Sequence, residues 1–429
     1  MLAGRCGPAA QKAMEIVVSL GQIYEAEDLV PVASVQVAGV SYKNLGKAGL
    51  EFLQGWARQG AKVRVPTTLN PAGMDLEQEL GFPEDFARRQ AEIIAAFREM
   101  GVTVSCTCAP YLVGNPPRFG EHLAWSESSA VGFANSILGA RTNREGGPGA
   151  LAAAIAGRTA RYGLHLEENR RPTHIVEVRC PMKSEADYGA LGHLVGKMVG
   201  GGVPYFRGME DGGWTIGDKR YAIRELRALG AAMAASGAVA LYHIEGITPE
   251  ARRGIEFAPG AKTFIIESLA EAYAALNTSA EAVRPAHDEE EIDFVALGCP
   301  HASLMDIEEI ASWVKGQNLK ARLWVTTARQ IKEEAARRGL VKIIEEAGGR
   351  VVADTCMVVA PVEVLGLRRM ATNSAKAAFY APSHCGLEVR FGPLEMCLEA
   401  ALTGRWPGGG QGATHLERCM APGITEVGQ

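Results

Sequence analysis

Apolar and polar positions along this chain follow two alternating periods, one typical of helices and one typical of strands. The helical period predicts helices over 8–22, 48–59, 84–100, 128–138, 148–156, 189–199, 222–235, 304–314 and 329–347. Short apolar, β-branched runs predict strands over 34–40, 62–66, 102–106, 173–179, 238–244, 294–297, 321–325 and 350–353. This alternation is typical of an α/β protein with mainly parallel sheets that are flanked by helices.

The length of the chain favours more than one domain, since 429 residues exceed what a single core usually organises. A polar stretch over 279–291 contains four consecutive acidic residues and has the composition of a linker. We therefore expect a first α/β region over 1–285, a second over 286–405, and a Gly-rich tail over 406–429.

Composition excludes several classes of protein. The formal charge of -5 gives no basic surface for nucleic acid. No run approaches the roughly 20 apolar residues that a membrane span needs, and the start of the chain lacks a signal-peptide pattern, so we expect a cytoplasmic protein with no membrane contact. Nine scattered cysteines, an odd number, favour reduced thiols over a disulfide framework.

Three of these cysteines occupy positions suited to a metal cluster. Cys108, Cys299 and Cys356 each end a short apolar run and precede a turn or a loop. Because strand ends in open α/β sheets meet at one crevice, three thiolates there could hold an iron–sulfur cluster with one iron left for substrate. No Cys-x-x-Cys pair is present, so the ligands would come from distant segments, and a buried core role is the alternative for each. Cys106 is a second candidate for the first ligand, but Cys108 lies nearer the loop.

Polar residues beside predicted strand ends and helix starts are candidates for binding a small anion. Arg141 and Arg144 precede a predicted helix, and guanidinium groups and helix N-termini both bind phosphate or carboxylate. The full set of candidate substrate-binding residues is Thr67, Thr68, Asn70, Asn135, Ser136, Arg141, Thr142, Asn143, Arg144, Ser374 and Lys376. Glu127, Ser128 and Ser129 are candidate catalytic residues. The polar residues among them equally suit turns and helix starts, and the alternative for the two arginines is a helix entry with solvated charges.

Long motifs in this chain resemble the aconitase X family. The resemblance covers nearly the whole chain and rests on 37–42, 65–70, 106–111, 120–128, 134–144, 162–165, 298–301, 354–356 and 372–376. It implies an aconitase-like fold with two or more α/β domains around a central cleft. It also implies a [4Fe-4S] hydro-lyase with Cys108, Cys299 and Cys356 as cluster ligands and one open iron.

The resemblance leaves two chemistries open. One is the dehydration of mevalonate 5-phosphate to trans-anhydromevalonate 5-phosphate in an archaeal-type mevalonate pathway for isoprenoid synthesis. The other is the dehydration of cis-3-hydroxy-L-proline, for which a [2Fe-2S] cluster is the alternative cofactor. The segments 143–148 and 40–43 resemble the first branch, so we expect the phosphorylated substrate.

The resemblance also implies a partner. Family members need a small swivelling domain, fused or separate, whose serine acts as general base. The residues that remain after the second α/β region are too few for that domain, so we expect a separate small subunit. The remaining alternatives are a binding subunit without a cluster and a zinc hydrolase, although the nine histidines lack His-Glu-x-x-His spacing.

Overall fold

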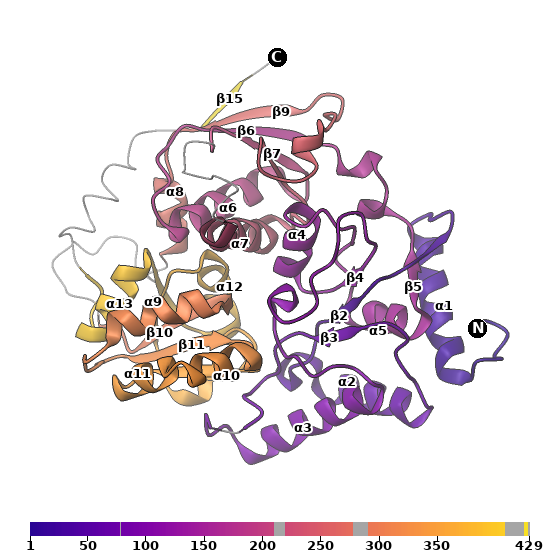
Figure 1. Ribbon diagram of the computed structural model, residues 1–429, viewed down its shortest axis with the longest axis horizontal. Coiled ribbons are helices and arrows are strands. Elements are labelled where there is room, and N and C mark those ends of the chain that lie inside the picture. The colour runs from indigo at the N-terminus through magenta and orange to yellow at the C-terminus, as the bar shows by residue number, and fades with distance from the viewer. Residues whose placement is uncertain (78, 210–218, 278–290, 408–423, 428–429) are drawn as a thin grey trace. The chain divides into compact units, whose positions relative to one another are not determined.

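The chain divides into two compact units. The computed structural model describes residues 1–77, 79–209, 219–277, 291–407 and 424–427. Unit 1 comprises Met1–Arg170 and Ala353–Pro361, and unit 2 comprises Arg171–Val352 and Val362–Gln429 (Figure 1). The boundaries of these units differ from the expected one near residue 285. Residues 171–277 contact the later α/β segment and belong to unit 2, whereas residues 353–361 belong to unit 1. The expected linker and most of the expected tail lie outside the described residues.

Unit 1 is built from short strands with helices packed against them. Its elements are α1 (Pro8–Ile23), β1 (Leu29–Pro31), β2 (Val35–Val37), α2 (Tyr42–Arg58), β3 (Thr67–Leu69), α3 (Glu84–Glu99), β4 (Ala124–Trp125), α4 (Ser128–Ser136), α5 (Gly147–Ala156) and β5 (Arg158–Ala160). Strands β3, β2 and β4 form a parallel sheet in that order, and β1 pairs with β5 in antiparallel fashion.

The core of unit 1 forms because two helices present small apolar side chains to each other. In α1 the residues Ala9, Ala13 and Val17 recur every four positions and are buried, so they form one apolar stripe. Helix α5 is apolar on all sides, and residues 150–156 are buried throughout. The two helices pack together in the cluster that also holds the central strand β2.

Two predicted strands of unit 1 are wrong. Residues 62–66 are not a strand, because their amides bond to irregular partners, as when Val63 N donates to Met100 O at 2.9 Å. The strand begins at Thr67 instead. Residues 102–106 contribute only an isolated bridge between Thr68 and Thr103, and the left-handed φ of 42° at Cys106 ends the extended conformation. Both threonines at 67 and 68 therefore lie within a strand and not after one.

Unit 2 contains two five-stranded sheets. Its first segment has β6 (His174–Val178), α6 (Glu185–Val199), β7 (Pro204–Arg207), α7 (Lys219–Gly237), β8 (His243–Ile244), β9 (Lys262–Ile266) and α8 (Ala270–Leu276). The second has β10 (Phe294–Ala302), α9 (Leu304–Val314), β11 (Arg322–Thr327), α10 (Arg329–Arg337), α11 (Leu340–Glu346), β12 (Arg350–Ala353), β13 (Arg369–Thr372), α12 (Ala375–Cys385), β14 (Glu388–Phe391) and α13 (Leu394–Thr403), and β15 (Ile424–Val427) follows. The strand orders are β15-β9-β6-β7-β8 and β12-β11-β10-β13-β14.

Most pairings in these two sheets are parallel, which confirms the predicted α/β class. Strand β15, from the expected tail, is an exception and pairs antiparallel with β9. Helices α6 and α7 lie side by side (Figure 1). The single helix predicted over 329–347 is split into α10 and α11, because Gly339 between them has a φ of 77°. Within the described ranges, no helix is long and apolar enough to cross a membrane.

Candidate active site

Three polar side chains meet at the carboxyl edge of the small parallel sheet in unit 1. Asn70 follows β3 directly, and Glu127 lies two residues after β4, so they flank β2 from opposite sides. Asn70 Nδ2 donates to Glu127 Oε2 at 2.7 Å, and Ser129 Oγ donates to Glu127 Oε1 at 3.0 Å. We call Asn70, Glu127 and Ser129 the strand-end cluster. The carboxyl edge of a parallel sheet is where α/β proteins bind ligands.

Glu127 is fixed by its place in the chain as well as by its neighbours. It is the N-cap of α4, where its carboxylate also accepts from Ser129 N at 3.4 Å. Carboxylates are stabilised at helix N-termini by the free amides and the helix dipole. The side chain is only partly buried, so the anchored carboxylate can still be reached by a ligand.

Gln36 joins this edge of the sheet and was not predicted from the sequence. It lies in the central strand β2, is fully buried, and donates to Thr107 O at 3.0 Å. The carbonyl oxygens Gln36 Oε1 and Asn70 Oδ1 are buried and accept no hydrogen bond within the described part of the chain. Unsatisfied buried acceptors are costly, and both are suited to a donor on a ligand. One sequence signal could have identified it, because Gln36 is an amide side chain between two valines in a segment predicted to be a strand.

The two threonines of β3 use their hydroxyl groups within the chain. Thr67 Oγ1 donates to Val65 O at 2.8 Å. Thr68 Oγ1 lies 3.4 Å from Val35 O and accepts from Asn115 Nδ2 at 3.5 Å. Both side chains are buried in the sheet. Of the three candidates in this segment, the structure therefore brings Asn70 alone into the strand-end cluster.

The candidate residues between 135 and 143 form a hydrogen-bonded loop. Asn135 Nδ2 donates to Thr142 O at 2.9 Å, and Thr142 N returns a bond to Asn135 Oδ1 at 3.0 Å. Asn143 Nδ2 donates to Tyr162 O at 3.0 Å and its Oδ1 accepts from Leu164 N at 2.8 Å. These side chains hold the loop that carries the two arginines. Ser136 is buried at the end of α4.

The two arginines of this loop differ in their surroundings. Arg141 is partly buried, donates to His165 O at 3.2 Å and forms an ion pair with Glu167. Arg144 is exposed. Ser128, in the first turn of α4, is buried. An anion could pair with Arg144 directly, whereas at Arg141 it would compete with the exposed carboxylate of Glu167.

A histidine pair lies beside Arg141. His122 Nδ1 and His165 Nδ1 are 2.9 Å apart, so one ring donates to the other. His165 is buried, and burial, followed by the charges of His122, Arg170 and Arg141, lowers its pKa to about 3. Burial and Arg141 also lower the pKa of His122. Both rings are therefore neutral at neutral pH.

This pair makes stability depend on pH in a defined window. Below its ordinary pKa near 6.5, His165 takes up a proton in the unfolded chain but not in the folded one. His165 should therefore contribute a fall of about 1.4 kcal/mol per pH unit in the free energy of unfolding as the pH drops from about 6.5 towards 3. Urea titrations at several pH values measure this slope. In a His165→Gln chain this slope should be smaller than in wild type by about that amount, and an unchanged slope in that variant would contradict the assignment.

Two of the three predicted cluster ligands lie near one turn of unit 1. Next to Cys108, Thr107 N donates to Leu69 O at 2.9 Å. Two residues before Cys356, Asp354 O accepts from Ala72 N at 2.8 Å. Both cysteine segments thus bind the same 69–72 turn that carries Asn70. Cys108 and Cys356 are buried but retain 6% and 8% exposure.

Cys106 differs from Cys108 in its environment. Its side chain is fully buried and belongs to the apolar core of unit 1. The left-handed φ at Cys106 turns the chain, so the two cysteines do not lie on one extended strand. Cys108 lies outside that core cluster, at the turn.

The third predicted ligand, Cys299, belongs to unit 2. It lies within β10, not after the strand as expected, and is partly buried. Across the described ranges, no three His, Cys, Asp or Glu side chains are close enough together to hold a metal ion. Thiols are the ligands that iron–sulfur clusters use, and Cys108 and Cys356 share one turn, so the residues present fit such a group.

Ser374 and Lys376 lie at the start of α12 in unit 2. Ser374 is the N-cap of this helix, and its Oγ accepts from Ala377 N at 3.1 Å. The same hydroxyl donates to Cys299 O. Lys376 is in the first turn of the helix and is 9% exposed. The structure therefore brings Ser374 to a predicted cluster ligand.

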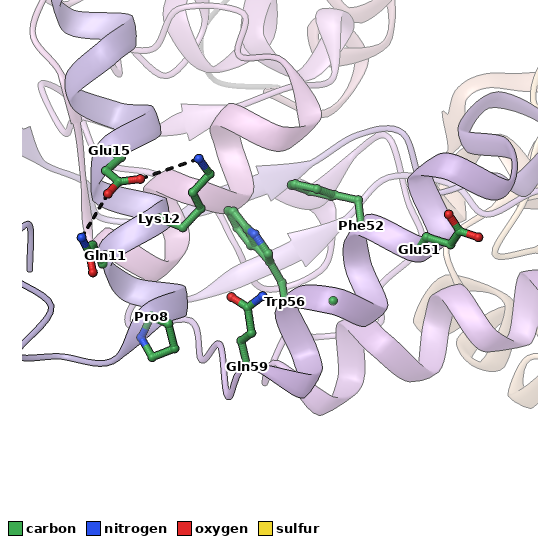
Figure 2. A pocket seen from close by; sticks show the side chains of 9 residues that line it. Pro8, Gln11, Lys12, Glu15, Glu51, Phe52, Trp56 and Gln59 are labelled. Carbon is green, nitrogen blue, oxygen red and sulfur yellow. Dashed lines mark hydrogen bonds and ion pairs between the residues drawn. The ribbon is translucent and has the colours of Figure 1, made fainter.

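A hollow of about 520 Å³ elsewhere in unit 1 has a different character (Figure 2). It lies between α1 and α2 and is lined by Pro8, Gln11, Lys12, Glu15, Glu51, Phe52, Gly55, Trp56 and Gln59. Figure 2 shows Glu15 bonded to Gln11 and Lys12 on one side and Phe52 and Trp56 on the other. None of the predicted site residues lines it, so its size does not mark the chemical site.

Sequence comparisons place this arrangement in a known family. The chain matches the profiles of the aconitase X first domain over residues 1–168, the second domain over 172–274 and the third domain over 292–403. It is 51% identical over 408 residues to the phosphomevalonate dehydratase large subunit of Methanocaldococcus jannaschii, covering 93% of this chain and 97% of that one. The chain belongs to the aconitase X family. This confirms the resemblance inferred from the sequence motifs.

Other aconitase X proteins resemble the chain to different degrees. A crystal structure of Thermococcus kodakaraensis aconitase X in its holo-form matches with a TM-score of 0.83 and 46% identity, over 93% of this chain and 97% of that one. This match confirms the aconitase-like fold. The cis-3-hydroxy-L-proline dehydratase of Pseudomonas aeruginosa is 35% identical over 421 residues, which are 95% of this chain and 70% of that protein.

Proposed function

We propose that this aconitase X chain is the catalytic large subunit of a hydro-lyase that dehydrates mevalonate 5-phosphate to trans-anhydromevalonate 5-phosphate. One observation carries the choice of substrate. The chain is 51% identical to a phosphomevalonate dehydratase large subunit, whereas it is 35% identical to a cis-3-hydroxy-L-proline dehydratase. The length agrees too, since the chain covers 97% of the former and 70% of the latter.

The cofactor we propose is a [4Fe-4S] cluster with one open iron. Its proposed ligands are Cys108, Cys299 and Cys356. When bound, such an iron supplies a Lewis acid that makes a tertiary hydroxyl a better leaving group. The burial of Cys106 in the apolar core supports Cys108 as the ligand from the first segment.

The strand-end cluster supplies groups for the substrate. Asn70 and Ser129 hold the Glu127 carboxylate in a fixed position, so it can accept a hydroxyl hydrogen bond or transfer a proton. The unpaired oxygens of Asn70 and Gln36 are suited to further substrate donors. In the reaction one proton leaves carbon, the C–O bond breaks, and the departing oxygen takes a proton to become water.

The anionic groups of the substrate need fixed cations. Arg144 is exposed on the loop held by Asn135 and Thr142, and Arg141 lies beside it. We assign phosphate or carboxylate binding to these two arginines, with Lys376 as the further candidate in unit 2. Fixed cations near a carboxylate also stabilise the charge that develops when the neighbouring carbon loses its proton.

The proposal also includes a partner subunit. Two relatives that are 51% identical to this chain are called large subunits, which implies a small subunit in those proteins. We propose that this chain likewise binds a separate small subunit with a swivelling domain, and that this partner contributes the general base.

The test compares two substrates in one preparation. The chain is co-expressed anaerobically with the small subunit, reconstituted with iron and sulfide, and assayed with mevalonate 5-phosphate and cis-3-hydroxy-L-proline in parallel. We expect water to be lost from the phosphorylated substrate alone. Turnover of hydroxyproline alone would overturn the substrate, and iron uptake without turnover of either would favour a binding subunit.

A further inference from the structure

The backbone around Cys299 departs from regular strand pairing. Strand β10 pairs in parallel with β11 over residues 294–297, and the register then shifts before Ala302 pairs with Thr327. The intervening residues form a bulge that contains Cys299. A bulge leaves backbone groups outside the ladder, so other donors must satisfy the carbonyl oxygens.

Hydroxyl groups from two neighbouring strands supply these donors. Thr326 Oγ1 lies 2.6 Å from Gly298 O and 3.2 Å from Leu297 O. Ser374, which follows β13, donates from its Oγ to Cys299 O. Hydrogen bonds therefore hold both the carbonyl of Gly298, which precedes Cys299, and the carbonyl of Cys299 itself.

The conformation before Cys299 leaves little freedom for adjustment. Gly298 has a φ of 87°, and a Cβ at this position would lie 2.2 Å from Thr326 O. Only glycine therefore fits between Cys299 and the neighbouring strand. This close approach places the Thr326 hydroxyl against the bulge.

One side of Cys299 faces a cavity. The residue lines a small cavity of about 20 Å³ together with Asn373 and Glu185, a volume that holds a single water molecule. Asn373 Nδ2 donates to Glu185 Oε2 at 3.0 Å, which holds the residue next to Ser374. The hydrogen bond from Ser374 thus holds the Cys299 carbonyl beside this cavity.

Ser374 is itself rigid, which makes it an effective anchor. Its Oγ accepts from Ala377 N at the start of α12, and its backbone N donates to Thr372 Oγ1 at 3.2 Å. One hydroxyl therefore joins the helix N-terminus to the Cys299 carbonyl. An anchor held at both ends can transmit a fixed position to the thiol of Cys299, the residue whose carbonyl it binds.

We infer that Ser374 is a positioning residue that sets the backbone of Cys299, so that its thiolate is oriented to ligate the cluster. This inference rests on the proposed function, because it takes Cys299 as a cluster ligand. It revises the sequence-based expectation that Ser374 binds substrate. Groups that orient metal ligands typically change metal affinity by about 10–100-fold when they are removed.

The test separates this role from helix capping. Ser374→Gly removes the hydroxyl but keeps a residue type that is accepted at an N-cap for a few tenths of a kcal/mol. Ser374→Thr restores the hydroxyl. Ser383→Ala, at the exposed end of the same helix, removes a hydroxyl that donates to Tyr380 O and serves as the matched control. Iron and sulfide per chain and the rate of iron loss to a chelator are measured after anaerobic reconstitution.

We expect the Ser374→Gly chain to lose iron about 10–100-fold faster than wild type. The Ser374→Thr and Ser383→Ala chains should keep the wild-type rate. An equal rate in wild type and Ser374→Gly would overturn the inference while leaving the proposed function intact. A wild-type chain that takes up no iron would instead overturn the proposed cofactor.

A second variant covers the case in which Ser374→Gly fails to fold. Thr326→Val is nearly isosteric and removes the hydroxyl beside Gly298 O. We expect faster iron loss in this variant as well, because the other side of the bulge is released. Melting temperatures of the iron-free chains show whether each variant is folded before the rates are compared. A folded Thr326→Val chain with the wild-type rate would show that the bulge needs no hydroxyl clamp.

Discussion

Replacement of Cys108 by Ser is expected to reduce bound iron and abolish dehydratase activity, whereas replacement of Cys106 by Ser should leave both in place. Cys108 lies at the turn shared with the Cys356 segment, and Cys106 lies in the apolar core of unit 1. The loss of activity at Cys108 should exceed about 100-fold, because a direct ligand matters more than the groups that orient it.

The comparison between the two cysteines is its own control. Both changes remove one sulfur from the same short segment. The Cys106→Ser chain should be less stable by about 1–3 kcal/mol, since it places a hydroxyl in an apolar core. The iron content of each variant, measured after anaerobic reconstitution, shows which of the two cysteines is the ligand. Retained iron in Cys108→Ser together with lost iron in Cys106→Ser would reverse the assignment.

Replacement of Glu127 by Gln is expected to lower kcat by about 10²–10⁴-fold with a smaller change in KM. The amide keeps the shape of the side chain and can still fill the space beside Asn70 and Ser129. It removes the negative charge and the capacity to exchange a proton. The effect should therefore appear in the chemical step more than in substrate binding.

A neighbouring carboxylate provides the control for Glu127. Glu121 lies in the same segment, and its side chain accepts from the backbone of Arg118. Glu121→Gln removes an equal charge away from the strand-end cluster and should leave kcat unchanged. Iron content should equal that of wild type in both variants. A Glu127→Gln chain with wild-type kcat would show that the strand-end cluster only supports the fold.

Local signals in the sequence were sufficient for most helices. The four-residue stripe of α1 and the small apolar run of α5 indicate their own burial, and both helices lie where the pattern predicted them. Short strands were harder, because three buried residues such as Thr67–Leu69 carry little periodic information. Their position depends on pairing with β2, which lies about 30 residues away in the chain.

In the candidate site, too, the sequence identified residues but not the partners that their side chains bind. Asn70, Glu127 and Ser129 were each chosen from the sequence, and the structure brings them into one hydrogen-bonded cluster. Asn135, Thr142 and Asn143 were also chosen, and the structure uses their side chains to hold a loop. A polar residue at a strand end can serve a ligand or the backbone, and composition does not distinguish these roles.

The sequence by itself determined the α/β class, the family and the residue types available for chemistry, because these depend on periodicity and on long local motifs. Only the tertiary structure decided which hydroxyls and amides are already bonded within the chain. It placed Cys106 in a core and Cys108 at a turn two residues away, and it joined Ser374 to the carbonyl of Cys299. Such pairings join residues far apart in the chain, and their geometry is set by the packing of whole strands and helices.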